Sequence, residues 1–387
     1  MRSVVLAGGG SGGHITPILA VAAELKRKDP SIRIIYIGQK GDSLADIPEK
    51  NPNIDEVYTV RAGKFRRYHG EGLKQLLDIK TMFLNIRDFF YVCIGIFQSW
   101  RLIKRIKPGA MFSRGGFVSV PVALGSKLNG VPYITHDSDS SPSLANKIIA
   151  RWASYHAVAL SKELYPYPES KTITTGIPLN KYFKYVDSDL KNKFRTELKI
   201  PKNALLVFVI GGGLGSRDIN TAMAEALPHL LEEFKNLHII QSAGRGNDQE
   251  LTIQYKEFLS ETALNRVEVH SFINEVYKYS GAADLVITRA GATNLAEFAV
   301  QGKPCIVIPS SFLAGGHQLK NARYLEEQGA IEVVQGDELV RDSNKLAQKI
   351  SNLLKDEAKR KSLGKVFNSF AQENASEKIV DLIIKLL

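Results

Sequence analysis

The most constraining feature of this 387-residue chain is a glycine-rich junction that occurs twice. The first copy follows the apolar run Val4–Ala7, reads Gly-Gly-Gly-Ser-Gly-Gly-His over residues 8–14, and precedes a helix-like segment at 16–25. Glycines at such a junction allow a tight turn and a close approach of the backbone to a ligand. The free N–H groups at the start of the next helix favour an anion, typically a phosphate. The pattern predicts a strand, an anion-binding loop and a helix.

The first junction also satisfies the dinucleotide pattern G-x-G-x-x-G. An NAD-binding domain places an acidic residue at the end of the next strand, where it holds the ribose. That strand is predicted at 32–37, and Gln39-Lys40 follows it. These residues disfavour NAD, but Lys40 suits an NADP phosphate. An NADP-dependent oxidoreductase is therefore one alternative function.

The second junction follows a predicted strand at 204–210 and contains Gly211-Gly212-Gly213-Leu214-Gly215. Around both copies, apolar strands alternate with helical segments, as expected of parallel sheets with helices on both faces. Prolines and turns at 165–168 and 176–178 interrupt this alternation and predict a domain boundary. The sequence therefore predicts an α/β protein with two Rossmann-like, doubly wound domains.

Ligands of parallel sheets bind at the carboxyl ends of the strands. In the first domain, polar or glycine-rich loops at 8–14, 114–117 and 136–139 each follow a predicted strand. We expect these three loops to share one rim.

Basic charge is concentrated at residues 61–107, where eleven basic residues face three acidic ones in a chain of net charge +11. Aromatic and apolar residues lie among them, a combination suited to an anionic bilayer surface. Lys64, Arg66, Arg67 and Phe83 are the candidate membrane contacts, whereas most of 92–103 is expected in the core. Nucleic acid is disfavoured because no recognised binding module is present. The longest uncharged apolar run, 89–97, is too short to span a bilayer.

The chain has two cysteines, Cys93 and Cys305, each within an apolar run. Two cysteines exclude a disulfide framework. Both are predicted to be buried thiols of a protein in a reducing compartment.

In their order along the chain, these stretches resemble the MurG family of UDP-N-acetylglucosamine transferases. Residues 8–14 are similar to the first glycine loop of the family, 62–68 to its basic A-G-K-x-R-R-Y segment, and 115–119 to its G-G-F-V-S motif. The second glycine loop matches as well. The segments Arg289-Ala290-Gly291-Ala292 with Glu297, and His317-Gln318 with Asn321-Ala322, are similar to the donor-site motifs.

The resemblance implies a GT-B fold, in which two Rossmann-like domains face a cleft. It implies an N-terminal acceptor and membrane domain at 1–178 and a C-terminal UDP-sugar domain at 179–367. The C-terminal helix, 368–387, would pack back on the N-terminal domain.

The resemblance also implies an inverting hexosyltransferase of peptidoglycan synthesis. Such an enzyme moves N-acetylglucosamine from UDP-GlcNAc to undecaprenyl-pyrophosphoryl-MurNAc-pentapeptide (lipid I). It would act peripherally at the cytoplasmic face of the cell membrane, without a metal or other cofactor. A related GT-B transferase using another UDP-sugar or lipid acceptor, such as diacylglycerol, is the nearest alternative.

Site residues are implied in both domains. His14 and Asp137 are the candidates for the base that takes the proton of the acceptor hydroxyl. Glu297 is expected to bind the ribose diol, and Gln318 the sugar hydroxyls. The substrate-binding residues are Gly10, Ser11, Gly12, Gly13, Asp139, Gly213, Leu214, Arg289, Ala292, Thr293, Glu297, His317 and Gln318.

The chain departs from the family pattern after one strand, where His136-Asp137-Ser138-Asp139 replaces H-E-x-N. Arg114 also stands where the family usually has a small residue. Asp137 and Asp139 form a D-x-D pair, by which other glycosyltransferases hold a divalent cation. A metal site is the less favoured interpretation, because the two helix starts already provide positive ends for a diphosphate.

Overall fold

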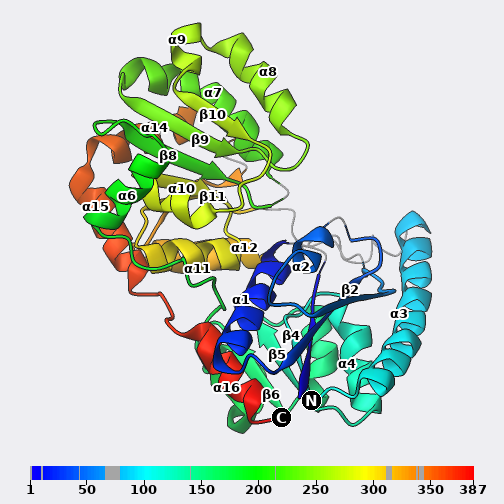
Figure 1. The fold of residues 1–387 in the computed structure, drawn as a ribbon. Helices are drawn as coiled ribbons and strands as arrows, with labels where there is room; N and C mark the ends of the chain where they lie inside the picture. Colours follow the sequence, from blue (N-terminus) through cyan, green and yellow to red (C-terminus); the bar gives the residue numbers. More distant parts are fainter. Residues whose placement is uncertain are drawn as a thin grey trace. The chain divides into compact units, whose positions relative to one another are not determined.

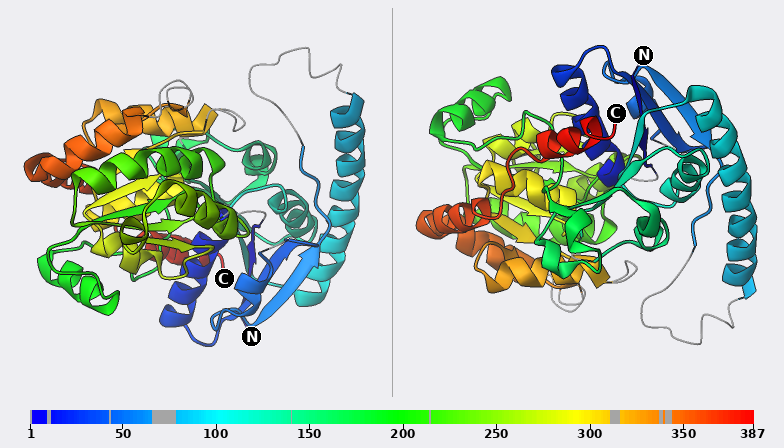
Figure 2. Two further views of the ribbon diagram at one scale, coloured as in Figure 1. Left: turned by 90° about the horizontal axis from the view of Figure 1, so that it is seen from above. Right: turned by 90° about the horizontal axis from the view of Figure 1, so that it is seen from below.

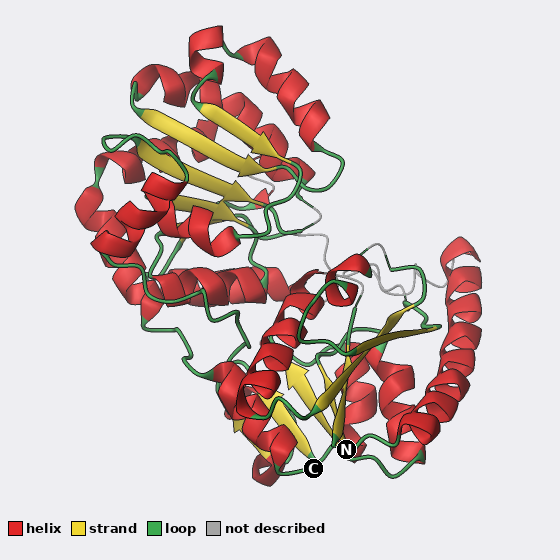
Figure 3. Ribbon diagram, in the orientation of Figure 1, coloured by secondary structure: helices red, strands yellow, loops and turns green. Residues whose placement is uncertain are grey.

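The computed structural model describes residues 2–9, 12–42, 44–65, 79–139, 141–213, 215–310, 316–336, 339 and 344–387. The chain forms two units (Figure 1). Unit 1 contains the chain up to Lys181 and its last segment, Gln372–Leu387. Unit 2 contains Tyr182–Ser311 and Gln318–Ala371. Each unit has a sheet flanked by helices (Figure 3).

The sheet of unit 1 is parallel, with strand order β3-β2-β1-β4-β5-β6-β7 within the described residues. β1 is central, and Val5 pairs with Ile35 on one side and Met111 on the other. Every residue of β1 is buried, as expected for a parallel strand covered on both faces. The strands are β1 (Ser3–Ala7), β2 (Arg33–Gln39), β3 (Glu56–Val60), β4 (Ala110–Ser113), β5 (Tyr133–Asp137), β6 (Tyr155–Val158) and β7 (Thr172–Thr174).

Two cores cover the faces of this sheet. One contains Leu6, Ile18 and Leu25 together with Ile379 and Ile383 from the end of the chain. The other contains Val5, Val122 and Ile149. The helices are α1 (Gly12–Lys28), α2 (Asp46–Glu49), α3 (Ile79–Ile106), α4 (Ser119–Leu128), α5 (Leu144–Ile149) and α16 (Ala375–Ile384), with 3-10 turns η2 (Ala150–Trp152), η3 (Lys162–Leu164) and η4 (Glu169–Lys171).

Unit 2 repeats this topology. Its order, β10-β9-β8-β11-β12-β13, places the first strand at the centre and is the order of the first six strands of unit 1. The two-domain Rossmann-like fold predicted from the sequence is therefore confirmed. The strands are β8 (Leu205–Ile210), β9 (Leu237–Ser242), β10 (Val267–His270), β11 (Leu285–Thr288), β12 (Cys305–Val307) and β13 (Glu332–Val333).

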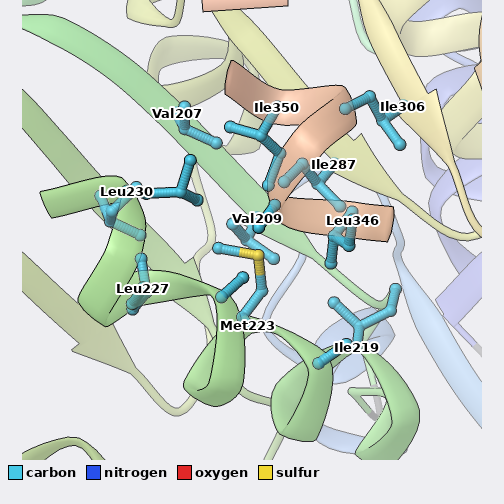
Figure 4. Close-up of a cluster of buried hydrophobic side chains, with 14 of the residues drawn as sticks. Val207, Val209, Ile219, Met223, Leu227, Leu230, Ile287, Ile306, Leu346 and Ile350 are labelled. Atoms are coloured by element: carbon cyan, nitrogen blue, oxygen red, sulfur yellow. The ribbon is translucent and has the colours of Figure 1, made fainter. Parts of the chain in front are cut away.

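Helices of unit 2 bury both faces of β8. Figure 4 shows one face, where Met223 and Leu227 of α7 and Leu346 and Ile350 of α14 surround Val209. The helices are α6 (Ser188–Glu197), α7 (Arg217–Glu233), α8 (Asp248–Phe258), α9 (Glu261–Leu264), α10 (Val276–Ala282), α11 (Ala292–Gln301), α12 (His317–Glu327), α14 (Asn344–Lys355) and α15 (Glu357–Asn368).

Helix α3 runs along the outside of unit 1 and packs on α4 through small residues (Figure 2). A Cβ atom at Gly125 would lie 2.7 Å from the Cβ of Ser99, and one at Gly95 would overlap a carbonyl oxygen of Arg61. The helices therefore approach closely only without side chains there. Large apolar residues face outward instead, and the exposed ones are Met82, Phe83, Ile86, Phe89, Phe90, Ile94 and Phe97.

This arrangement corrects two predictions. Much of 92–103 was expected in the core, but Phe97 is 60% exposed and Ile94 is 39% exposed. Cys93 is also exposed, whereas Cys305 is buried as predicted. The apolar run around Cys93 belongs to the outer face, because the inner face is reserved for small residues.

The last helix, α16, completes unit 1. Ile379 and Ile383 are fully buried against α1 and β1, and Lys28 of α1 pairs with Glu377 and Asp381. Figure 2 shows α16 beside α1 in unit 1. Unit 1 therefore depends on a segment that follows all of unit 2 in the sequence.

We predict that Ile383→Ala lowers the opening free energy of β1 and α1 amides by roughly 2–4 kcal/mol, the usual cost of such a cavity. Hydrogen exchange measures this change. Ile384→Ala, at a partly buried neighbour, is the matched control and is expected to cost less. Amides of β8 in unit 2 should not change. Equal losses in β1 and β8 would show that α16 is not specific to unit 1.

Candidate active site

Three loops of unit 1 follow neighbouring strands and come together at one rim. β1 pairs with β4, and β4 pairs with β5. The backbone N–H of Arg114 donates to the carbonyl of Ala7 over 3.1 Å. A Cβ atom at Gly116 would lie 3.6 Å from the ring of His14. The predicted meeting of the loops at 8–14, 114–117 and 136–139 is confirmed for their described residues.

His14 lies in the first turn of α1, which begins at Gly12. Its ring hydrogen-bonds to the backbone of Arg114, and burial and the charge of Arg114 lower its pKa to about 4. The buried Nδ1 atom has no hydrogen-bond partner among the residues that the structure describes. The imidazole is therefore neutral near pH 7, and its Nδ1 keeps one hydrogen-bonding position without a partner in the described part of the chain.

Asp137, the last residue of β5, has both carboxylate oxygens occupied by donors. Asn146 Nδ2 donates to Oδ1 over 2.8 Å, and the backbone N–H of Ser143 donates to it over 3.2 Å. The hydroxyl of Tyr167 donates to Oδ2 over 2.7 Å. Burial raises the pKa of Asp137, whereas these hydrogen bonds oppose the rise. The carboxylate is well suited to hold its loop in place.

Arg114 is a buried cation beside this carboxylate and is 5% exposed. Burial lowers its pKa to about 10, against the opposing effects of Asp139 and Asp137, so it stays charged at neutral pH. Its Nε atom has no hydrogen-bond partner within the described part of the chain. Arg114 is thus electrostatically coupled to Asp139 and Asp137, and all three positions depart from the family pattern. From the sequence, Arg114 was recognised only as a departure from the family pattern, and its charge pairing was not predicted.

Unit 2 presents the second glycine loop at the end of its central strand. Gly215 has φ +76°, and a Cβ atom there would overlap the carbonyl oxygen of Ala243. Ser216 caps α7 by accepting from the N–H of Ile219. Asn220 of α7 donates to the same Ala243 carbonyl over 3.1 Å and accepts from Gln241. The loop is therefore fixed against β9, with the start of α7 directed to the rim.

Glu297 lies in α11, the helix that follows β11, and is 9% exposed. Burial raises its pKa to about 8. Thr293, one turn earlier, is also buried, and Ala292 is the first residue of the helix. A buried carboxyl at the carboxyl edge of a sheet is costly unless a ligand donates hydrogen bonds to it.

Arg289 and Gln318 fix loops around the same rim. Arg289 Nη2 forms an ion pair with Asp218 in the first turn of α7 over 2.6 Å, and Nη1 donates to the Ile308 carbonyl over 3.2 Å. Gln318, in the first turn of α12, accepts from the Ser310 N–H over 2.9 Å and is buried. Arg289 thus links neighbouring strand ends, and Gln318 links the start of α12 to the loop after β12.

The remaining predicted site residues have simpler placements. Gly12 and Gly13 are in the first turn of α1, and Gly213 lies in the loop near Phe272. Asp139 is partly buried beyond β5, and His317 is the first residue of α12. The predicted residues Gly10, Ser11, Leu214, Arg66 and Arg67 lie outside the described residues.

Two absences apply to the part of the chain that the structure describes. The described residues contain no group of three or more His, Cys, Asp or Glu side chains that could hold a metal ion. No helix in the described part of the chain is long and apolar enough to cross a membrane. Helix starts, buried carboxyls and an imidazole suit an anionic ligand and acid–base chemistry.

Comparison with known families decides between the functions that these rims allow. Residues 4–158 match the N-terminal domain of glycosyltransferase family 28, and residues 206–381 match its C-terminal domain. The chain belongs to glycosyltransferase family 28. Family membership confirms the resemblance found in the sequence and favours a transferase over an oxidoreductase.

Named relatives extend over nearly the whole chain. A UDP-N-acetylglucosamine–N-acetylmuramyl-(pentapeptide) pyrophosphoryl-undecaprenol N-acetylglucosamine transferase of Clostridium novyi is 34% identical over 99% of this chain and 98% of its own length. One of Natranaerobius thermophilus is 30% identical over 99% of this chain and all of its own. The crystal structure of Acinetobacter baumannii MurG has a TM-score of 0.70 at 22% identity, covers both chains completely and shares the fold.

We predict that Glu297→Gln stabilises the protein in a pH-dependent manner. The pKa of Glu297 is about 8 in the folded chain and ordinarily near 4.5. The folded state therefore holds the proton more tightly, and its stability falls as the pH rises from about 4.5 to 8. The melting temperature of the variant should equal that of the parent near pH 4.5 and exceed it at pH 8. Thermal unfolding at the two pH values measures this difference.

Glu332→Gln is the control with the opposite sign. Burial by itself would raise the pKa of Glu332, but hydrogen bonds from Lys349 and Lys359 lower it below its ordinary value. That carboxylate stabilises the fold at neutral pH, and the contribution is lost as the pH falls through its folded pKa. Glu332→Gln should therefore melt below the parent at pH 8. A Glu297→Gln variant that behaves in the same way would contradict the assigned burial effect.

Proposed function

We propose that this chain transfers N-acetylglucosamine from UDP-GlcNAc to undecaprenyl-pyrophosphoryl-MurNAc-pentapeptide, as the names of its relatives state for them. The observation that carries the proposal is family membership over both units, with relatives 34% and 30% identical over nearly full length. The helix starts and buried titratable groups at both rims support it. The enzyme would serve peptidoglycan synthesis.

In this proposal, unit 2 binds the donor. Glu297 accepts hydrogen bonds from the ribose diol, which favour its ionised form over the neutral form favoured by burial. The start of α7 and the glycine loop bind the diphosphate, whose negative charge grows as it leaves. Gln318 contacts the sugar. The ion pair of Arg289 with Asp218 holds the β11 loop beside α7.

Unit 1 binds the acceptor, with the start of α1 near its diphosphate. We propose His14 as the base, because its Nδ1 is open whereas both oxygens of Asp137 already accept hydrogen bonds. The neutral imidazole takes the proton of the acceptor hydroxyl as that oxygen attacks the anomeric carbon and UDP leaves. Attack opposite the leaving group inverts the anomeric centre. An anionic acceptor near His14 also raises its pKa from about 4 toward neutrality.

We propose that the reaction needs no metal ion. The contacts of the D-x-D pair support this view, because both oxygens of Asp137 already accept hydrogen bonds, from Asn146, Ser143 and Tyr167. Arg114 already lies beside both carboxylates as a counter-charge. The helix starts replace the cation that a D-x-D enzyme would use to neutralise the leaving diphosphate.

We further propose that α3 docks the enzyme on the anionic, cytoplasmic face of the membrane. Its exposed apolar residues recur at positions 82, 83, 86, 89, 90, 94 and 97, which form one face of a helix. The exposed basic residues Arg87, Arg101, Lys104 and Arg105 lie on the same helix, and Lys64, which precedes it in the sequence, is exposed as well. A lipid-linked acceptor lies in that surface, so docking brings the acceptor to unit 1.

The transfer is tested by UDP release from UDP-GlcNAc with a lipid I analogue, with and without EDTA. We expect turnover that survives EDTA and a β-linked product by NMR. Loss of activity in EDTA would contradict the metal-free mechanism. Turnover with diacylglycerol instead of the lipid I analogue would identify the related transferase and overturn the acceptor assignment.

Membrane docking is tested by Phe89→Ser with Phe258→Ser as its matched control. The two rings are equally exposed, at 54% and 55%, but Phe258 lies on α8 in unit 2. Losing one ring inserted in the bilayer costs about 1.5 kcal/mol of binding free energy. The partition coefficient of the protein between membrane and water then falls about tenfold. Sedimentation with phosphatidylglycerol liposomes should show this loss only for Phe89→Ser. An equal loss for Phe258→Ser would rule out a docking role specific to α3.

A further inference from the structure

The segment Tyr165-Pro166-Tyr167-Pro168 lies in unit 1 between the 3-10 turns η3 and η4. Each tyrosine precedes a proline, which favours extended backbone at the tyrosine. Tyr165 has φ −113° and ψ 138°. Side chains two residues apart in an extended chain point to the same side. The rings of Tyr165 and Tyr167 are accordingly stacked, with centroids 6.3 Å apart and planes 10° apart.

Both phenol hydroxyls reach the loop that follows β5. The hydroxyl of Tyr167 donates to Asp137 Oδ2 over 2.7 Å, and that of Tyr165 donates to the backbone carbonyl of Asp139 over 2.9 Å. Tyr165 also accepts from the N–H of Leu160 over 3.4 Å. The segment therefore binds the loop at both ends of the Asp137–Asp139 stretch.

The sheet supports this stack from behind. The ring of Tyr167 lies on that of His156 in β6, with centroids 4.1 Å apart and planes 15° apart. His156 Nδ1 hydrogen-bonds to the hydroxyl of Thr135 in the paired strand over 2.9 Å. Burial lowers the pKa of His156 to about 4 and raises the pKa of both tyrosines. The stack is therefore neutral, and both phenols remain donors at physiological pH.

We infer that the Tyr165–Pro168 segment is the positioning element of the acceptor-side loop, with the Tyr167 hydroxyl orienting Asp137 and the Tyr165 hydroxyl orienting the Asp139 backbone. The catalytic part of this inference rests on the function proposed above. A purely packing role predicts that phenylalanine serves equally well at both positions. The positioning role requires the hydroxyls, so a single oxygen atom separates the two explanations.

The first test is independent of activity. Tyr167→Phe keeps the ring on His156 and removes the donor to Asp137. Its matched control is Tyr133→Phe, at the start of β5, where another buried phenol donates to the Ile149 carbonyl over 2.5 Å. Carbon-13 NMR of the aspartate carboxyl groups, with Asp137→Asn for assignment, gives the pKa of Asp137 in the full chain.

We expect Tyr167→Phe to raise the pKa of Asp137 by about one pH unit, because a hydrogen bond to the charged form is lost. Burial favours the neutral form, and the remaining partners, Asn146, the Ser143 N–H and Arg114, favour the charged one. The nearby histidines His14 and His136 are neutral, with pKa values lowered to about 4 and about 3. Tyr133→Phe should leave the pKa unchanged. An unchanged value in Tyr167→Phe overturns the inference.

The second test uses turnover with UDP-GlcNAc and the lipid I analogue. Tyr167→Phe and Tyr165→Phe should each lower kcat/KM for the acceptor about tenfold, as small displacements near the chemistry do. KM for the donor should stay within twofold, and Tyr133→Phe should match the parent. In Tyr167→Phe the acid limb of the pH profile should also move to higher pH. An inactive parent would overturn the proposed function, whereas an active parent matched by both variants would overturn this inference.

Discussion

Parallel pairing around one central strand determines where the chemistry of each unit occurs. β1 and β8 have ladder partners on both sides, and helices cover both of their faces. Every crossover must then return over a face of the sheet, so successive loops end at the same edge. Residues far apart in sequence, such as His14, Arg114 and Asp137, meet only because their strands are neighbours. The site is a consequence of strand order.

Those edges carry buried ionisable groups. Glu297 is buried with a pKa raised to about 8, and Arg114 is buried with an Nε that has no partner among the described residues. Buried ionisable groups of this kind cost free energy unless opposite charge or ligand hydrogen bonds compensate them. In unit 1 the compensation is internal, because Arg114 lies beside Asp137 and Asp139. In unit 2 the compensation for Glu297 would come from the donor itself.

Local patterns predicted most of the central strands. The strands predicted at 4–7, 32–37 and 204–210 are found as β1, β2 and β8. The strands at Glu56–Val60, Tyr155–Val158 and Thr172–Thr174 were missed, since they lie toward the sheet edges and are short or partly exposed. A strand of three or four residues beside turns has too little periodicity to be recognised.

The positions of the candidate site residues could be predicted from the sequence, but their hydrogen-bond partners could not. The sequence placed Asp137 at the end of a predicted strand and His14 at the start of the helix after the first glycine loop, at the edge where ligands of parallel sheets bind. It could not show that Tyr167, thirty residues after Asp137, donates to it, or that Asn146 fills its other oxygen. Such pairs depend on which strands and turns become neighbours. In the proposed mechanism, the hydrogen bonds that Asp137 already accepts are what favour His14 over it as the base, and only the fold reveals them.

Helices α3 and α16 show why apolar periodicity alone does not identify a core face. Both carry a regular apolar stripe, yet α16 buries Ile379 and Ile383 while α3 exposes Phe89 and Phe97. The difference lies on the opposite face of α3, where Gly95 and Ser99 permit a close approach to α4 that large side chains would prevent. A helix packed through its small residues must turn its large ones outward. Unit 1 is therefore left with an exposed apolar surface. Its contact with water is unfavourable, and insertion into a bilayer would remove that contact.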